Sequence, residues 1–433
     1  MKDSNQHFLH LVSLIVFISG MGYSIITPII PIYADEAGAS SFLIGVMVAS
    51  YAVFHILAQA PGGVFADRVG PKRIIFIGLL LIAVSSFMFT LTDDVWLFIL
   101  FRAIEGAGSG VIFPAASAYV FSISKNENRG QYMGTFLSSW IIGFTLGPAI
   151  GGALSDEFGI KTPFYFCTFI SLIAIVLMEI ILKDPEGSKE GDQPESFLIR
   201  AKRIVKAKGM PAVLFRGFTI QFNNGINMMA MALFLHEIVE MSNTLIGFLF
   251  FTEGFVMLLF TPYGGRLADR IGRKKPIIFG GFAVAIAFFL IPTITNFSHT
   301  MGSVTINEFI AIGPFTIDEF IYGCFLMGIL GFGFGINSPA AMSLITETSP
   351  GKQKGTGLGV YGIITGIGFI IGPLVAGFLY EKDVSYPFRL ATVMALISIT
   401  FVHFFVQETA KIQHDAKKSA ISLKEEAEVM SER

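Results

Sequence analysis

The chain has 433 residues, of which 53% are hydrophobic and only 14% are charged, and its mean hydropathy is +0.68. A soluble domain carries roughly 25% charged residues, so much of this surface must face something other than water. The formal net charge of −2 gives no reason to expect a nucleic-acid partner. The two cysteines, Cys167 and Cys324, lie in apolar stretches and indicate neither a disulfide framework nor a metal site.

Apolar stretches long enough to cross a bilayer, which takes about 20 residues, follow one another along the chain. The first is too long for the apolar core of a cleaved signal peptide, so we interpret it as a membrane span. The sequence therefore predicts an all-α membrane protein with twelve spans. They cover residues 8–33, 42–66, 74–92, 95–123, 131–154, 163–182, 211–236, 244–267, 276–295, 318–346, 355–380 and 387–407.

The basic residues between these spans are distributed asymmetrically. If the N-terminus is cytoplasmic, 25 of the 30 lysines and arginines lie on the cytoplasmic side and three lie on the other side. An excess of basic residues marks cytoplasmic loops. We therefore predict a multi-pass protein of the cell membrane, inner or plasma, with both termini in the cytoplasm.

One segment of the chain occurs twice. Residues 62–73 read GGVFADRVGPKR, and residues 264–275, at an offset of 202, read GGRLADRIGRKK. Farther along the offset becomes 225, because Gly147-Pro148 matches Gly372-Pro373. This change predicts an insertion near residues 295–317, in an external loop of unknown purpose. The predicted domains are a six-helix bundle over 1–182, a cytoplasmic linker over 183–210, a second six-helix bundle over 211–408 and a cytoplasmic tail over 409–433.

The linker over 183–210 begins as a polar segment and then becomes basic, with apolar residues interleaved from Phe197 onward. Two interpretations are equally favoured. The segment could be a solvated connecting helix, or an interfacial helix that contacts anionic membrane lipid.

At these motifs the chain resembles the major facilitator superfamily across its whole length. The pattern from Arg102 to Gly106 resembles the family's Arg-x-x-Gln-Gly motif, with Glu105 in place of the glutamine. The signature between spans two and three, with its second-half copy, is matched by Gly63, Asp67, Arg68, Gly70, Arg73, Gly265, Asp269 and Arg270. The motif typical of drug:proton antiporters is matched in the fifth span by Gly143, Gly147, Pro148, Gly151 and Gly152.

The resemblance implies twelve helices in two pseudo-symmetric six-helix bundles, and transport by alternating access at their interface. It favours a proton-coupled exporter of amphipathic small molecules or drugs. The alternatives are an importer or facilitator of a polar metabolite, such as a sugar or organic acid, and a membrane sensor that does not transport. We expect no enzyme activity, no cofactor beyond the proton gradient, and a monomer whose partners are a small-molecule substrate, protons and lipid.

Asp67 is the predicted principal inner gate. A carboxylate at the end of a span can cap a neighbouring helix and pair with Arg68 or Arg73, so it could bridge the halves when the inner side is closed. Asp269 is the expected weaker counterpart. The alternative is that these charges only anchor the loop on the cytoplasmic side.

The small residues between Gly143 and Gly152 lie on one face of the fifth span, and Pro148 should bend it. They predict close helix packing, a hinge or seal between the halves, or both.

Arg102, Glu105 and Glu253 are the candidates for proton coupling. A charged group inside a span is costly, so each should face the interior and find a partner. Arg102 and Glu105, three residues apart, share a helix face and can pair. A static ion pair, or a structural hydrogen bond for Glu253, is the alternative. By resemblance Arg102 occupies a position linked to proton transfer, and which group carries the proton stays open.

Polar side chains inside several spans are candidates for the lining of a substrate cavity, with hydrogen bonds between core helices as the alternative. For His55 and Gln59, one turn apart, a packed pair is favoured. Arg216 lies near a span end and is expected to extend toward the membrane surface. The candidate lining residues are Tyr23, His55, Gln59, Tyr119, Gln221, Asn224, Asn227 and Asn337.

Overall fold

The computed structural model describes residues 2–124, 128–182, 197–207, 209–296, 317–348 and 354–406. Within these ranges the secondary structure is helical, without a strand, which confirms the predicted all-α class. The first part of the predicted linker (183–196), nearly all of the predicted loop over 295–317 and the predicted tail over 409–433 lie outside the described residues.

The first bundle begins with a divided span. Its two helices, α1 and α2, are separated at Thr27 and Pro28, because proline lacks the N–H group that a helix interior needs. The helices of this bundle are α1 (Lys2–Ile26), α2 (Ile29–Glu36), α3 (Ser41–Val69), α4 (Pro71–Phe89), α5 (Val95–Ile123), α6 (Arg129–Phe158) and α7 (Thr162–Ile181).

The second bundle begins with an irregular span. Its regular helix α9 has 17 residues and continues into the π-helical turns η1 and η2. Eleven other described segments have the length and apolar composition of a span, so this one completes the predicted twelve. The elements are α9 (Met210–Ile226), η1 (Asn227–Met231), η2 (Phe234–Ile238), α10 (Asn243–Ile271), α11 (Lys274–Leu290), η3 (Ile291–Asn296), α12 (Ile317–Thr348), α13 (Lys354–Tyr380) and α14 (Tyr386–Phe405).

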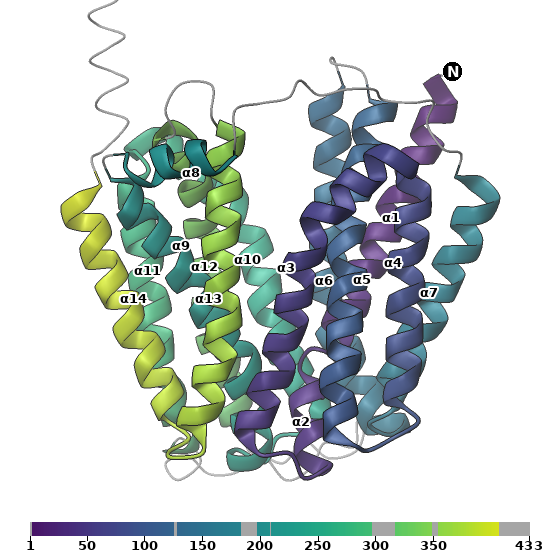
Figure 1. Cartoon of the computed structure of the whole chain (residues 1–433). Coiled ribbons are helices and arrows are strands. Elements are labelled where there is room, and N and C mark those ends of the chain that lie inside the picture. Colours follow the sequence, from purple (N-terminus) through teal and green to yellow (C-terminus); the bar gives the residue numbers. More distant parts are fainter. Residues whose placement is uncertain are drawn as a thin grey trace, which may run out of the picture.

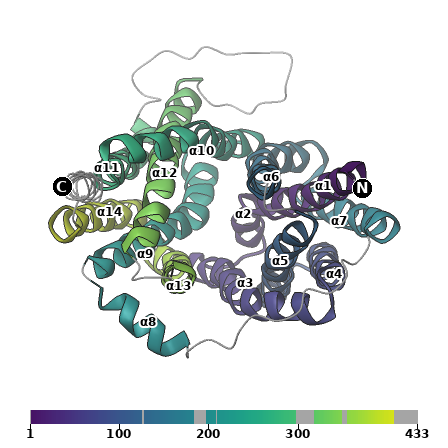
Figure 2. The ribbon, with the colours of Figure 1, turned by 90° about the horizontal axis from the view of Figure 1, so that it is seen from above.

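The two bundles lie side by side and meet along two pairs of helices. Figure 2 shows α3 next to α13 on one flank and α6 next to α10 on the other. In Figure 1 the bundles approach each other at the end away from the N-terminus and diverge toward the other end. We call the first the sealed end, where α3 and α10 begin and α6 and α13 end, and the second the open end.

Glycines allow the helix backbones to come close at the sealed end. A Cβ atom at Gly45 of α3 would collide with the carbonyl oxygen of Pro373 in α13. On the other flank, a Cβ atom at Gly247 of α10 would collide with the carbonyl oxygen of Pro148 in α6. Small residues are what permit such approach between membrane helices.

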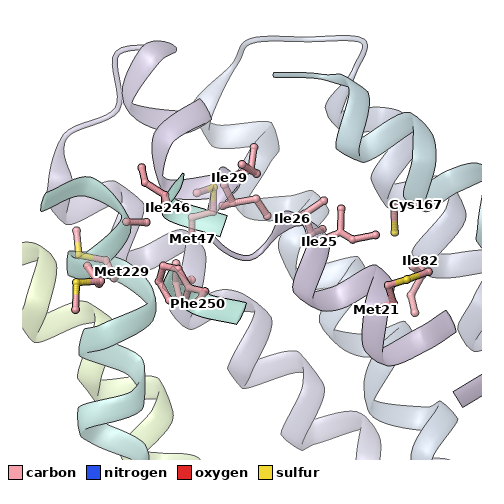
Figure 3. Packing of buried hydrophobic residues seen from close by; sticks show 14 of the residues in the cluster. Met21, Ile25, Ile26, Ile29, Met47, Ile82, Cys167, Met229, Ile246 and Phe250 are labelled. Atoms are coloured by element: carbon pink, nitrogen blue, oxygen red, sulfur yellow. The ribbon is translucent and has the colours of Figure 1, made fainter. Parts of the chain in front are cut away.

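One hydrophobic cluster continues across the sealed end from one bundle to the other. Figure 3 shows Ile29 and Met47 of the first bundle beside Met229, Ile246 and Phe250 of the second. All five side chains are buried. The sealed end is therefore closed by apolar packing as well as by close backbones.

The linker helix α8 (Phe197–Val205) lies at the open end (Figure 1), at the outer edge of the second bundle next to α9 and α13 (Figure 2). Its Ile204 is fully buried and packs in a cluster with Val213 and Leu214 of α9. Lys202 of this helix and Lys206, just after its end, are exposed. The apolar side of this helix thus packs on protein, and a contact of its basic side with lipid stays a prediction.

Candidate functional site

Arg102 and Glu105 of α5 form a buried ion pair. Arg102 Nη1 lies 2.7 Å from Glu105 Oε2, and both side chains are 1% exposed. Both charges lose their hydration on burial, so their mutual attraction offsets this cost only when the two groups lie close together and are well aligned. The guanidinium also lies over the ring of Tyr51 in α3, 4.4 Å from its centroid. The spacing in the sequence predicts the pairing of the two charges but not the aromatic contact.

Aromatic rings extend this site along the first bundle. The ring of Tyr51 stacks on Tyr23 of α1 at a centroid distance of 4.7 Å and on His55 at 5.5 Å. Gln59 Nε2 lies 3.4 Å from His55 Nδ1 and the Gln59 side chain is exposed, and the interpretation as a packed pair stays a prediction. Tyr23 is half-buried and also faces Phe144 of α6.

Glu253 lies in α10, in the other bundle, with a different kind of partner. Asn227 donates a hydrogen bond from Nδ2 to Glu253 Oε2 at 2.9 Å. Among the described residues no basic side chain pairs with this carboxylate. Asn227 begins the π-helical turn η1, and such turns frequently mark functional sites in helices. Asn227 Oδ1 is buried without a hydrogen-bond partner among the described residues.

Side-chain contacts that start from each of the two carboxylates reach neighbouring residues of the chain, Asn227 and Met228, at the bundle interface. Asn227 precedes Met228, whose sulfur accepts a hydrogen bond from Tyr23 Oη at 3.4 Å. From Tyr23 the row continues through Tyr51 to the Arg102–Glu105 pair. We call this the polar row, from Glu253 through Asn227, Met228, Tyr23, Tyr51 and Arg102 to Glu105.

The repeat shows that the two halves contribute different groups. At an offset of 225, Arg102 and Glu105 correspond to Met327 and Leu330 of α12, which are buried apolar residues. At an offset of 202, Glu253 corresponds to Tyr51. The ion pair therefore belongs to the first half alone, and the amide-bound carboxylate belongs to the second.

Arg216 of α9 does not extend to the membrane surface as expected, because it is buried in the second bundle. Its Nη1 donates to Ser398 Oγ of α14 at 2.8 Å. The amide oxygen of Asn337 in α12 accepts from two further guanidinium nitrogens, one of them Nε at 3.2 Å. Neutral acceptors on two neighbouring helices thus hold this cation inside the bundle.

The predicted cavity residues differ in how far they are exposed. Tyr119 and Asn337 are fully buried within their own bundles in this conformation, and their place in a cavity lining stays a prediction. Tyr119 packs in the first bundle's core, and Asn337 binds Arg216. Gln221 and Asn224 are half-buried, whereas Gln59 is exposed.

The duplicated segments end α3 and α10 at the open end. Gly70 and its counterpart Gly272 have φ angles of +96° and +91°, in the left-handed region that favours glycine, and each terminates its helix. The side chains of Asp67, Arg68 and Arg73 are exposed, and Asp67 has no ion-pair or hydrogen-bond partner among the described residues.

The second copy of this segment is tied down within its own bundle. Arg273 pairs with Asp269 at 2.9 Å and with Glu347 at the end of α12 at 2.8 Å. Arg270 is exposed. Glu347 corresponds at an offset of 225 to Ser122, so the first copy lacks this carboxylate, and its own anchor is an ion pair between Lys72 and Glu179 of α7 at 3.0 Å. Of the two aspartates in the duplicated segments, only Asp67 has no partner among the described residues, and its gating role stays a prediction.

Asp67→Asn should slow transport without weakening this conformation. Because Asp67 is exposed and unpaired here, the free energy of unfolding should change by less than about 0.5 kcal/mol. If Asp67 is the gate, the turnover rate should fall, because the conformation closed at this end loses the charge of the Asp67 carboxylate. The dissociation constant for the substrate should not change. Fluorescence titration and transport in proteoliposomes measure the two quantities. A loss of affinity with an unchanged maximal rate would contradict the gate.

The fifth-span glycines use two faces of α6. Cβ atoms at Gly143, Gly147 and Gly151 would collide with α1 in the same bundle. A Cβ atom at Gly152 would instead collide with the carbonyl oxygen of Asn243 in α10 of the other bundle. The structure thus shows both packing within a bundle and contact between bundles, and the hinge role stays a prediction.

An exposed ion pair also connects the loops of the first bundle at the sealed end. Lys161 Nζ lies 2.8 Å from Asp93 Oδ1, and Tyr33 Oη donates to the same oxygen at 2.8 Å. The hydrogen bond from Lys161 lowers the pKa of Asp93, and the same bond raises the pKa of Lys161. Both groups are therefore charged at neutral pH.

Comparison with known proteins identifies the family of this chain. A sequence model of the Major Facilitator Superfamily matches residues 12–218 and again residues 213–429. This chain belongs to the Major Facilitator Superfamily. It is a multi-pass membrane transporter, and the two matches correspond to the two halves of the internal repeat.

Several superfamily relatives are similar over most of their length. An uncharacterized transporter of this type from Methanocaldococcus jannaschii is 31% identical over 372 residues, covering 84% of this chain and 89% of the relative. Multidrug resistance protein 1 of Bacillus subtilis is 27% identical, covering 89% and 92%. Quinolone resistance protein NorA of Staphylococcus aureus is 26% identical, covering 92% and 96%. The chain thus resembles the drug:proton antiporter branch of the superfamily.

Solved structures of superfamily transporters share the fold. The nucleoside transporter NupG matches with a TM-score of 0.77 at 14% identity, over 92% of this chain and 100% of that one. A bacterial homologue of the human lysosomal transporter Spinster matches with a TM-score of 0.72 at 13% identity, over 93% and 97%. These matches confirm the predicted two-bundle fold.

Proposed function

We propose that this transporter exports amphipathic small molecules in exchange for protons by alternating access. The observation that carries the proposal is the polar row, which connects Glu253 in one half to Glu105 in the other. Glu253 is bound by the neutral amide of Asn227 and not by a basic side chain of the described residues. Its carboxylate can therefore bind a proton or a cationic group of the substrate in turn. The row links that exchange to the interface at which the halves must move.

The aromatic side chains near the row support an amphipathic substrate. Trp140 stacks on Phe144 at a centroid distance of 5.5 Å, and Phe144 faces Tyr23. Such rings offer apolar surface and attract cations. The printed names of the Bacillus subtilis and Staphylococcus aureus relatives, which refer to multidrug and quinolone resistance, favour the same substrate class.

The predicted topology gives this conformation a place in the cycle. With both termini in the cytoplasm, the open end faces the cytoplasm and the sealed end faces outward. An exporter in this state takes up its substrate from the cytoplasm or the inner leaflet. Closure at the open end, where Asp67 is predicted to act, and opening at the sealed end then complete transport.

Everted membrane vesicles with a preformed acidic interior test the proposal. A quinolone or a lipophilic cationic dye should dissipate the pH gradient of vesicles that contain the wild-type chain. Glu253→Gln should abolish this response, because the amide cannot exchange a proton. Glu36→Gln, which changes an exposed carboxylate at the end of α2, is the matched control and should respond like the wild type.

Two results would contradict parts of the proposal. Full proton movement in the Glu253→Gln variant would show that another group carries the proton. A gradient released only by a nucleoside, a sugar or an organic acid would overturn the export of amphipathic compounds and favour a polar metabolite.

A further inference from the structure

At the sealed end, a carboxylate of one bundle caps a helix of the other. Asp156, in the last turn of α6, accepts hydrogen bonds from the first backbone N–H groups of α10, from Asn243 at 3.2 Å and from Thr244 at 2.6 Å. Asn243 also donates its side-chain amide to Ser155 Oγ at 3.1 Å. The residue before α10, Ser242, makes no side-chain cap. Asp156 therefore supplies the N-terminal cap that α10 does not provide for itself.

The opposite flank has the corresponding contact in the reverse direction. Glu381, directly after α13 in the second half, accepts a hydrogen bond from the backbone N–H of Phe42 at 3.1 Å. Phe42 is the second residue of α3 in the first half. The side chain of Ser40, the residue before α3, accepts from the backbone N–H of Leu43 at 3.4 Å, so Glu381 satisfies a further N–H group of this helix end.

The two contacts occupy equivalent positions of the repeat. Asp156 corresponds to Glu381 at an offset of 225, and Thr244 corresponds to Phe42 at an offset of 202. The glycines one turn before these carboxylates are also equivalent in the repeat. A Cβ atom at Gly152 would collide with the carbonyl oxygen of Asn243, and one at Gly377 would collide with that of Ser41. A coincidental surface contact would not recur in register on both flanks.

We propose that Asp156 and Glu381 are positioning residues for transport, which hold the sealed end closed by two reciprocal helix caps. Each carboxylate faces the positive end of a helix dipole in the other half, where a negative charge is stabilising. The inference rests on the alternating access of the proposed function. It adds an outer pair of gate residues that neither the sequence motifs nor the relatives' names assign.

The caps stabilise the conformation that is closed at the sealed end and not the one that is open there. Both carboxylates lie at the exposed surface. When the halves separate at this end, water can hydrate the carboxylates and the helix ends, so the caps contribute only to the closed state. A group shifts a two-state equilibrium by its differential interaction with the two states. Loss of the caps should therefore favour the conformation that is open at this end.

Distances between spin labels measure this equilibrium directly. One label replaces Leu91 in the first half and the other replaces Lys382 in the second, both exposed at the sealed end, in a background with Cys167→Ser and Cys324→Ser. Removing one cap, by Asp156→Ala or Glu381→Ala, should raise the ratio of open to closed populations about fivefold. The double variant should raise it more than either single variant.

Matched variants separate the cap from general damage. Glu157 is an exposed carboxylate next to Asp156 and has no partner among the described residues. Glu157→Ala should therefore leave the label distances unchanged. Asp156→Asn keeps an acceptor oxygen and should shift the ratio less than Asp156→Ala. Asp156→Lys places a positive charge at the helix end and should shift it most. If the alanine variants do not accumulate, the asparagine and lysine variants still give the comparison.

The outcomes are separate from those of the proton-coupling test, because the label distances need neither a substrate nor a pH gradient. Distances that are unchanged in the double alanine and lysine variants would overturn the proposed gate, whatever the vesicle assay shows. A shift of equal size in Glu157→Ala would also overturn it, since a general loss of surface charge would then explain the result. A graded shift confined to Asp156 and Glu381 would support it.

Discussion

Replacing Arg102 by methionine and Glu105 by leucine together should leave the transporter folded but abolish the proposed proton-coupled transport. The second half holds Met327 and Leu330 at the equivalent positions, buried in the same superfamily fold. Apolar residues of similar volume often replace a buried ion pair without loss of stability. The double variant therefore removes the charges and keeps the packing.

The single variants should behave differently from the double variant. Glu105→Leu leaves the guanidinium of Arg102 buried without its carboxylate, which is expected to cost about 3–5 kcal/mol of stability. Arg102→Met leaves the carboxylate alone in the same way. Thermal unfolding of the detergent-purified proteins should therefore rank the double variant near the wild type and both single variants well below it.

Transport separates a functional pair from a static one. If the pair takes part in coupling, vesicles with the folded double variant should show no substrate-driven release of the pH gradient. A double variant that is both stable and fully coupled would show that Arg102 and Glu105 are only a structural ion pair. In that case Glu253 would be the remaining candidate of the polar row.

Gly152→Val should shift the transporter away from the conformation described here and reduce its turnover strongly. The added side chain would collide with the carbonyl oxygen of Asn243 only while the sealed end is closed. Overpacking a close contact costs about 1–3 kcal/mol, so the share of the closed state should fall about 5- to 150-fold. The spin-label pair at Leu91 and Lys382 measures this shift, and substrate transport measures the rate.

Two other glycines of α6 provide the controls. Gly151→Val places its side chain against the carbonyl oxygen of Ile25 in the same bundle, so it should lower thermal stability whichever end is open. Gly134 has open space around its Cβ position, and Gly134→Val should change neither stability nor label distances. Equal behaviour of Gly151→Val and Gly152→Val would contradict the assignment of separate faces to the two residues.

The sequence determined most of the architecture by itself. Apolar length fixed the number of spans, because the bilayer sets the minimum length of a helix that crosses it. The duplicated segments showed that the chain contains two related halves. The spacing of Arg102 and Glu105 predicted their contact, because residues three apart on a helix share a face. These features are local or periodic, so they can be recognised without a structure.

The tertiary structure alone decided which polar groups meet across helices. Arg216 is held by Ser398, 182 residues away, instead of reaching the membrane surface. Tyr51 covers Arg102, and Tyr23 reaches Met228 of the other half. Such contacts depend on the rotation and tilt of each helix, which packing against its neighbours sets.

Asp156 and Glu381 illustrate which features can be recognised in the sequence and which require the tertiary structure. Their equivalence at an offset of 225 is visible in the sequence, although both resemble ordinary loop acids there. Only the structure shows that each binds the start of a helix in the other half. The sequence by itself determined the two halves and their duplicated motifs. The tertiary structure decided which end is closed, because closure consists of contacts between helices far apart in the chain.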